Sequence, residues 1–188
     1  MGSCEELVAN KAVHQQFFEL DDSEKDAKLW GLIQELGKDA KIVAFANTKR
    51  RIDYLAKACW EEGLGASAIH GDKSQADRDK ALKAFTTGEW PLMFATDVAA
   101  RGLDIKGVTH VINFDMPRDV ENYIHRIGRT ARAGSKGVAI TFWNKSYDIP
   151  CAPALAKIAR EAGQEVPGWL EDWAKKASRQ KKDKNWNY

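Results

Sequence analysis

Three basic side chains, His125, Arg129 and Arg132, recur at helical spacing within the stretch HRIGRTARAG (125–134). A helix expected from Asp119 to about Arg132 would place all three on one stripe, because residues three and four positions apart share a helix face. Neither arginine has an acidic residue three or four positions away, so we expect a polyphosphate to supply the negative charge. An amphipathic helix with a basic solvent face is the plain alternative, but the small residues around the arginines leave room for a ligand.

Two loops that follow apolar runs also offer groups that bind anions. Thr48 follows the run 41–46, and Thr96 follows the run 92–95. Ligands of open parallel sheets bind at the carboxyl ends of the strands, so both hydroxyls are candidates for phosphate contacts. The three cations at 49–51 oppose the positive end of a helix dipole unless an anion lies close by. A threonine cap with basic side chains directed into water fits that loop equally well.

A third loop, HGDKSQADR (70–78), follows another apolar run. Gly71 permits a close approach of the backbone to a ligand, and Ser74 is a good helix cap. Gln75 and Arg78 are three positions apart and lie on one face of the first helical turns. We predict that they direct an amide and a guanidinium at the same segment of a nucleic-acid backbone.

These loops are positioned by short apolar runs that alternate with helical segments. A first strand is expected at about 12–20, and a helix from Ser23 to about Gly37, with Ser23 and Asp26 as a candidate capping box. Further strands are expected at 41–46, 66–70, 92–95, 108–114 and 137–143, with helices at 48–62, 74–85 and 119–132. Apolar strands that alternate with helices predict an α/β fold with a parallel sheet covered on both faces.

The carboxyl-terminal part is expected to be less regular. Pro150 and Pro153 confine the helix within 146–163 to its second half, and the segment Trp169–Trp173 is expected to dock on the body. We expect residues 1–10 to be an expression scar and linker, 11–174 to be the folded domain, and 175–188 to be a basic, flexible tail.

The tail is strongly basic. Six cations are opposed by Asp183 alone: Lys175, Lys176, Arg179, Lys181, Lys182 and Lys184. A solvated, disordered tail and an auxiliary RNA-contacting tail both fit this composition.

Composition is that of an ordinary globular protein of 188 residues, with 44% hydrophobic and 30% charged side chains. The net charge of +2 does not by itself indicate a nucleic-acid binder, so any RNA site must come from local placement of basic groups. Cys4, Cys59 and Cys151 are scattered and indicate reduced thiols in an intracellular protein, nuclear or cytoplasmic. We expect no membrane span, no metal site and a monomeric domain.

Four stretches, taken together and in order, resemble the motifs of the DEAD-box RNA helicases. IVAFANTKR (42–50) resembles motif IV, HGDKSQADR (70–78) motif IVa, ATDVAARGLDI (95–105) motif V and HRIGRTARAG (125–134) motif VI. The resemblance runs from about Val13 to Leu170. RecQ-type DNA helicases and DEAH-type RNA helicases place Gln where His125 stands, which argues against both. Ala131 is a small departure, because many members of the family have Gly there.

The resemblance implies a role for each matched residue. Arg129 and Arg132 match arginine fingers that reach the γ-phosphate of ATP held on another domain. Asp104 matches the acid that binds the ribose hydroxyls, and Gly102 shapes its loop. Five residues match positions that contact the RNA sugar-phosphate backbone in the family: Thr48, Gly71, Gln75, Arg78 and Thr96. His125 and Arg126 match groups that couple the two domains.

The resemblance also implies a RecA-like, three-layer α/β/α domain with a mostly parallel central sheet. The sequence contains no Gly-x-x-x-x-Gly-Lys-Ser/Thr loop and no Asp-Glu-Ala-Asp. We therefore expect ATP and Mg²⁺ to be held by a missing N-terminal RecA-like domain, and the fragment alone to be inactive. Joined to that domain, it would drive local RNA duplex unwinding or RNP remodelling. The alternatives are a non-catalytic RNA- or protein-binding module and an ATP-dependent DNA translocase.

Overall fold

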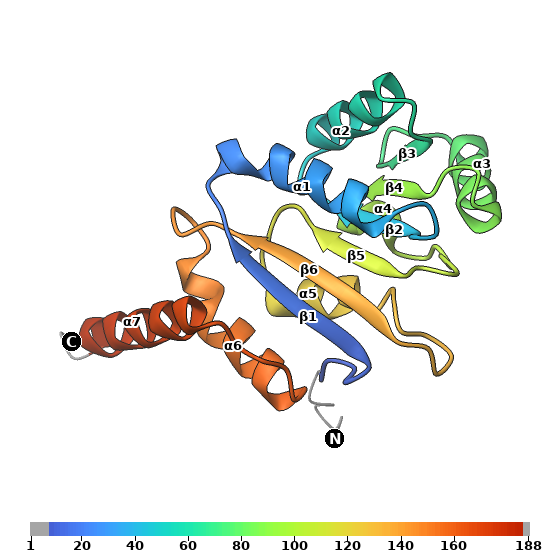
Figure 1. Cartoon of the computed structure of the whole chain (residues 1–188). Helices are drawn as coiled ribbons and strands as arrows, with labels where there is room; N and C mark the ends of the chain where they lie inside the picture. The colour runs from blue at the N-terminus through green and yellow to red at the C-terminus, as the bar shows by residue number, and fades with distance from the viewer. Residues whose placement is uncertain (1–7, 186–188) are drawn as a thin grey trace.

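A computed structural model describes residues 8–185 and contains one six-stranded sheet in which every strand pair is parallel (Figure 1). The strand order is β1-β6-β5-β2-β4-β3. The strands are β1 (Val13–Glu19), β2 (Ile42–Phe45), β3 (Ala66–Ile69), β4 (Leu92–Ala95), β5 (His110–Asn113) and β6 (Gly137–Trp143). The four strands in the middle of the order are buried along most of their length, which is typical of a sheet covered on both faces. The predicted parallel sheet is confirmed.

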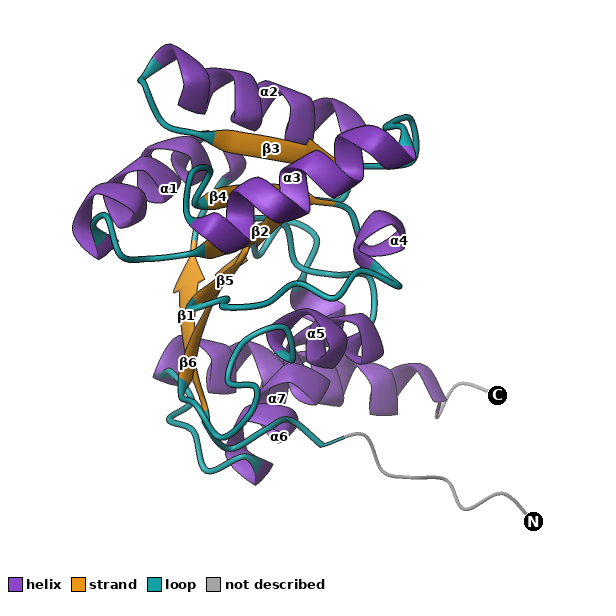
Figure 2. Cartoon of the chain, turned by 90° about the vertical axis from the view of Figure 1, so that its right-hand side faces the viewer, coloured by secondary structure: helices purple, strands orange, loops and turns teal. Residues whose placement is uncertain are grey.

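Helices cover both faces of this sheet. They are α1 (Asp22–Leu36), α2 (Lys49–Glu61), α3 (Gln75–Thr87), α4 (Asp97–Ala100), α5 (Val120–Ile127), α6 (Ala152–Glu161) and α7 (Gly168–Asn185), with a 3-10 helix η1 (Ile149–Cys151) before α6. One hydrophobic layer contains Leu29 of α1 and Leu55 of α2, and the other contains Phe85, Tyr123 and Leu155 from α3, α5 and α6. Figure 2 shows α1 and α5 on opposite sides of the sheet. The three layers of the predicted fold are therefore present.

The first helix begins earlier than expected. The backbone N–H of Asp21 donates to the Glu24 carboxylate at 3.0 Å, which ties the start of α1 to its first turn. The predicted pair, Ser23 and Asp26, lies inside the helix instead. A capping box needs a polar cap residue and an acidic side chain three positions later. Both Asp21 with Glu24 and Ser23 with Asp26 fit this spacing, so the sequence pattern alone could not distinguish the two pairs.

Helix α5 is much shorter than predicted. It ends at Ile127, and the following residues leave the helical conformation. Ala131 and Ala133 have φ of +58° and +56°, and Gly134 has φ of +79°. Left-handed backbone costs an alanine about 1 kcal/mol, whereas glycine adopts it freely. Glycine would therefore adopt the backbone conformation at position 131 at lower cost than the alanine of this chain. Arg129 and Arg132 are consequently loop residues, and the predicted stripe on one helix is wrong.

The carboxyl-terminal segment docks as expected, but it also continues as a helix. Trp169 and Trp173 lie 5.2 and 6.1 Å from Trp143 between ring centroids, and Leu170 is fully buried. Helix α7 then passes the predicted boundary at residue 174 and runs to Asn185, projecting beyond the body (Figure 1). The segment expected to be a flexible tail from 175 is thus helical as far as Asn185, because alanine, lysine, arginine and glutamine are good helix formers.

Parts of the predicted linker, including Cys4, lie outside the described residues. Between residues 8 and 185, no helix is both long enough and apolar enough to cross a membrane.

Candidate functional site

The loops singled out in the sequence meet at one edge of the sheet, because all strands run in the same direction. Thr48 caps α2, where its Oγ1 accepts a hydrogen bond from the backbone N–H of Arg51 at 3.2 Å. Ser74 caps α3 in the same way, with a 3.1 Å bond from the N–H of Asp77. Helices α2 and α3 therefore both begin at this edge of the sheet, where the remaining free N–H groups of their first turns are available to an anion.

The loops after β2 and β3 are joined by an ion pair. Lys49 Nζ lies 3.0 Å from Asp72 Oδ1, and both side chains are exposed. The exposed carboxylate of Asp72 has a lowered pKa, because it accepts a hydrogen bond from the Lys49 ammonium. Gly71 lies beside this pair, and a Cβ built there would make only ordinary contacts with Lys49, at 3.8 Å or more. The fold itself therefore does not require glycine here, and close approach of a ligand at Gly71 stays a prediction.

Gln75 and Arg78 do not converge as predicted. The Gln75 side-chain amide donates along α3 to Asp79 at 2.9 Å. Arg78 turns back toward the loop, where its guanidinium is 3.4 Å from the carbonyl oxygen of His70, and its buried Nε has no partner among the described residues. The two groups flank the loop rather than share a target, but Arg78 keeps an unsatisfied donor at the sheet edge.

Arg126 is the centre of a buried polar network. Its side chain is 1% exposed and forms a bidentate pair with Asp97, at 2.6 and 2.8 Å. The same guanidinium donates to Asn47 Oδ1 at 2.8 Å and to the carbonyl oxygen of Asp115 at 2.7 Å. Arg126 thus connects the loops that follow β2, β4 and β5. Its predicted coupling role cannot involve direct contact with another domain, because every donor is directed into this domain.

The network continues to the first helix. Asp115 accepts from the backbone N–H of Asn47 at 2.9 Å and pairs with the buried Lys25 of α1 at 3.1 Å. Burial opposes the charge of Lys25, but the hydrogen bonds that its ammonium donates to Tyr147 and Asp115 outweigh this effect, so the pKa of Lys25 is raised. The loops after β2, β4 and β5, the loop after β6 that carries Tyr147, and helix α1 are therefore connected by hydrogen bonds at the carboxyl edge of the sheet.

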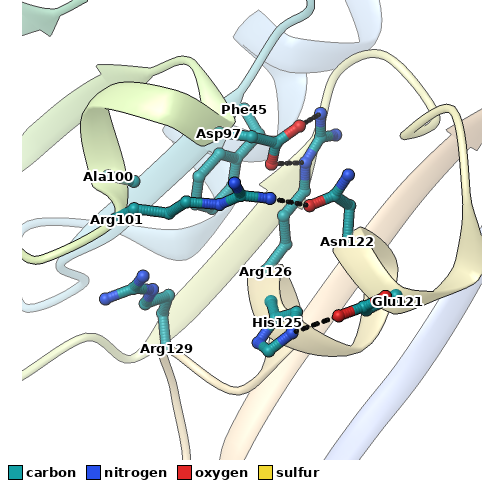
Figure 3. Close-up of a pocket in the computed structure, with 9 residues that line it drawn as sticks. All are labelled: Phe45, Asp97, Ala100, Arg101, Glu121, Asn122, His125, Arg126 and Arg129. Carbon is teal, nitrogen blue, oxygen red and sulfur yellow. Dashed lines mark hydrogen bonds and ion pairs between the residues drawn. The ribbon is translucent and has the colours of Figure 1, made fainter.

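His125 lies outside this network, at an open cleft of about 320 Å³ (Figure 3). The cleft is bounded by α4 and α5, and Figure 3 shows Arg101, His125 and Arg129 around it. His125 is 59% exposed and lies 3.5 Å from Glu121 in the same helix, while Arg101 donates to Asn122 at 3.2 Å. His125 is therefore exposed, whereas its neighbour Arg126 is buried, and the interdomain role of His125 stays a prediction.

The two arginines predicted as fingers lie in the loop after α5. Arg129 is half-buried and donates to the carbonyl oxygen of Leu103 at 2.9 Å, and Arg132 is 3.2 Å from Asp104. Burial, together with the positive charge of Arg132, lowers the pKa of Arg129. The guanidinium remains charged at neutral pH, so this environment favours an added anion. No acidic residue lies three or four positions from Arg132 in the sequence, but the loop after β4 supplies a carboxylate partner, Asp104.

The loop that carries Arg129 and Arg132 is anchored to the rest of the domain through Thr130. Thr130 Oγ1 donates to the carbonyl oxygen of Val108 at 2.6 Å, and Gly137 lies so close to Thr130 that a Cβ there would clash at 2.2 Å. Anchoring at Thr130 fixes the positions from which Arg129 and Arg132 project.

The loop after β4 supplies the remaining predicted residues. Gly102 has φ of +75° and open space around its Cβ position, so the backbone conformation accounts for glycine there. Asp104, two residues on, is exposed. Thr96, which is half-buried, precedes α4 at its N-cap position, and its hydroxyl makes no capping hydrogen bond.

Sequence reasoning missed Asn47, Asp97 and Asp115, which hold the buried arginine. The sequence did contain a signal for them, because each is a polar residue two positions after the end of a buried strand. Within residues 8–185, no group of three or more His, Cys, Asp or Glu side chains is arranged to hold a metal ion.

Comparison with known proteins gives a consistent result. Residues 24–134 match the family described as "Helicase conserved C-terminal domain". The chain is 46% identical over 185 residues to "DEAD-box ATP-dependent RNA helicase 40" of Oryza sativa subsp. japonica; the match covers 98% of this chain but 23% of that protein.

Solved structures are similar as well. The RNA helicase Prp28 of Chaetomium thermophilum bound to ADP superposes with a TM-score of 0.77 at 32% identity, covering 90% of this chain and 40% of that one. The E. coli DEAD-box protein SrmB bound to RraA gives a TM-score of 0.67 at 36% identity, covering 84% of this chain and 93% of that one.

Proposed function

The chain belongs to the DEAD-box helicase family, and we propose that it acts as the second RecA-like domain of an ATP-dependent RNA helicase. The carrying observation is the position of Arg129, Arg132 and Asp104 side by side at one corner of the domain. Two fixed positive charges beside an exposed carboxylate suit the phosphate and ribose ends of a nucleotide, respectively. No phosphate loop occurs in the sequence, so these residues fit only part of such a ligand.

ATP with Mg²⁺, held by an upstream RecA-like domain, supplies the phosphoryl group and the free energy for strand separation. Arg129 and Arg132 then stabilise negative charge that develops on the transferred group, an effect worth about 10³–10⁵-fold in comparable phosphoryl-transfer enzymes. Asp104 accepts hydrogen bonds from the ribose hydroxyls, in the loop that Gly102 shapes. Arg132 must leave Asp104 for both residues to act, which an exposed pair permits at small cost.

RNA is proposed to lie along the carboxyl edge of the sheet. Thr48, Gly71 and Thr96 offer small groups and backbone N–H donors there, and Gln75 and Arg78 flank them. Contacts of this kind recognise the sugar-phosphate backbone and leave the bases unread, so binding should tolerate many sequences. Local duplex separation or RNP remodelling would follow when this domain closes on its partner.

Coupling between the two ligands is proposed to run through Arg126. It joins the loop of Asn47, next to Thr48, to Asp97, next to Thr96, at distances below 3 Å. His125, one residue earlier and exposed, is proposed to contact the upstream domain directly. A buried charge that holds two RNA-facing loops would transmit a shift of α5 to both of them.

The decisive experiment compares phosphate release by this chain with that of its full-length parent protein, each with and without single-stranded RNA. We expect RNA-stimulated turnover by the parent and none above background by the chain. RNA-stimulated hydrolysis by the chain alone would disprove the assignment of the triphosphate site to another domain. RNA binding without turnover by the parent would favour a non-catalytic binding module.

A further inference from the structure

We propose that the second half of α7 continues the RNA track, by forming a basic groove with η1 and the start of α6 that takes the phosphate backbone of single-stranded RNA. The inference rests on the proposed function, because the strand is taken to arrive from the sheet edge at Thr48. It adds a second contact surface, remote from that edge, that would hold the flanking strand.

The charge of this helix is the first observation. Six cations lie between Lys175 and Lys184 with Asp183 as the single acid, and all six are exposed. Within residues 8–184, none of them pairs with a carboxylate at ion-pair distance. Like charges one turn apart, such as Lys175 and Arg179, destabilise a helix by about 0.2–0.5 kcal/mol per pair. A bound polyanion removes that cost, so the helix is suited to one.

The shape beside the helix is the second observation. A groove of about 760 Å³ separates α7 from the segment that contains η1 and the start of α6. Lys181, Lys182 and Lys184 line one wall, and Pro150 and Ala154 line the other. Cations along one side of an apolar channel are an arrangement that tracks a single-stranded backbone.

Continuity with the sheet edge is the third observation. An adjoining cleft of about 530 Å³ shares Pro150 and Ala154 with the first and reaches Asn47 and Arg118 at the edge. Asn47 immediately precedes Thr48, so the two clefts connect the proposed RNA contact to α7. The two clefts are therefore neighbours, with Arg118 beside the sheet edge and Lys181, Lys182 and Lys184 beside α7.

The middle of the path is less positive but carries an aromatic ring. Asp119 and Asp148 line it, and each already accepts a backbone hydrogen bond, from Asn122 at 2.7 Å and from Asn144 at 2.8 Å. Tyr147 is 50% exposed in this cleft, and its hydroxyl is fixed by the ammonium of Lys25 at 3.0 Å. A fixed, exposed ring offers a surface for base stacking, worth about 1–3 kcal/mol per base in single-strand binders. An aromatic ring between two basic ends favours RNA over an acidic peptide.

The test measures fluorescence anisotropy of the 188-residue chain with labelled single-stranded RNAs of about 6 and about 20 nucleotides, the lengths spanning one short binding site and more than one. The groove variant is Lys181→Gln/Lys182→Gln/Lys184→Gln. The control, Lys38→Gln/Lys83→Gln/Lys136→Gln, makes the same charge change at exposed positions before β2, on α3 and before β6.

We expect the groove variant to bind the longer RNA at least about fivefold more weakly, with the salt slope reduced by about 2 for three lost phosphate contacts. The shorter RNA should bind as before to both variants, and the control should match the unmodified chain. Equal losses in both variants, or no loss in either, would overturn the groove. Loss of binding to a glutamate-rich peptide with RNA binding intact would overturn it in favour of an acidic protein partner. A chain that binds the longer RNA through α7 but not the shorter one would support the groove and disprove the sheet-edge site.

Discussion

The guanidinium of Arg132 lies 3.2 Å from the carboxylate of Asp104, so the proposed finger and the proposed ribose ligand hold each other in the free domain. Both side chains are at least half exposed, at 51% and 68%. A solvent-screened pair of this kind contributes about 0–1 kcal/mol. The contact therefore orients both groups without preventing either from engaging a nucleotide.

Conservative replacement of the fingers should separate catalysis from binding. In the full-length parent protein, Arg129→Lys or Arg132→Lys keeps the charge but loses the planar fork, so turnover should fall at least about tenfold with little change in ATP affinity. Steady-state ATP hydrolysis and equilibrium nucleotide binding provide the measurements. Arg132→Lys should leave the melting temperature of this chain nearly unchanged, as exposed substitutions alter stability by about 0.5 kcal/mol or less. Normal turnover with impaired RNA binding would reassign these arginines to the RNA site.

Arg126 should instead matter for folding. Arg126→Leu leaves Asp97 without its bidentate partner and Asn47 without a donor, and breaking a buried ion pair costs about 3–5 kcal/mol. Urea unfolding of the chain measures this loss. Arg101→Leu, an exposed arginine that reaches Asn122 in the same cleft, is the matched control and should cost well under half as much. A stable Arg126→Leu chain would show that the network carries no net stability.

Arg78→Ala should weaken RNA binding by the parent protein across unrelated sequences. The substitution removes a cation that faces the loop of His70, and loss of one phosphate contact should reduce the salt dependence of affinity by about one ion. Titrations at several salt concentrations measure this effect. Lys83→Ala removes an exposed cation from the same helix and should have no comparable effect. A loss confined to one RNA sequence would mean that Arg78 contacts a base.

Asp148 should make stability depend on pH. Burial raises its pKa to about 6 against an ordinary value of 3.8, while the Asn144 hydrogen bond and Lys25 oppose the rise and Asp115 and Asp22 add to it. The folded state therefore binds a proton more tightly than the unfolded state. The resulting stability is fully present below about pH 4 and is lost as the pH rises through about 6, with a change of about 3 kcal/mol.

Asp148→Asn removes that dependence, because the amide has no charge to bury. Between pH 4 and pH 7, values that lie on either side of the raised pKa of Asp148, the unmodified chain should lose unfolding free energy that the Asp148→Asn variant keeps. The unfolding free energy of the variant minus that of the unmodified chain should therefore increase with pH. Urea unfolding at several pH values gives the curve, and Asp172→Asn on the exposed face of α7 controls for loss of a charge. A difference that does not vary with pH would place the dependence on other groups.

Much of the fold follows from short-range patterns. Each apolar run became a strand within about two residues, because a run of that length has to be buried on both faces. Three loops were correctly assigned to one edge, since parallel strands place their carboxyl ends together. The positions of Thr48, Ser74 and Gly102 agree with local capping and turn chemistry.

The geometry of the arginines could not be read in this way. Helical spacing from His125 to Arg132 suggested one stripe, but tertiary anchoring of Thr130 on Val108 draws the chain out of the helix after Ile127. The pairing of Arg132 with Asp104 and the burial of Arg126 depend on residues from other loops. Periodicity describes one segment at a time, so it carries no information about such partners.

The position of β1 at the edge of the sheet has a consequence for synthesis. Its only strand partner among the described residues is β6, and Val13 pairs with Gly137, so all the other strands must emerge from the ribosome before β1 can be paired. Non-local parallel pairing is slow to form, and exposed strands are prone to aggregate while they wait. The exposed or partly exposed side chains of β1 are His14, Gln16, Phe18 and Glu19. Three of the four are polar, which makes the unpaired strand a poorer template for pairing with another molecule. Synthesis of β6 is thus the earliest point at which all six strands can join into one sheet.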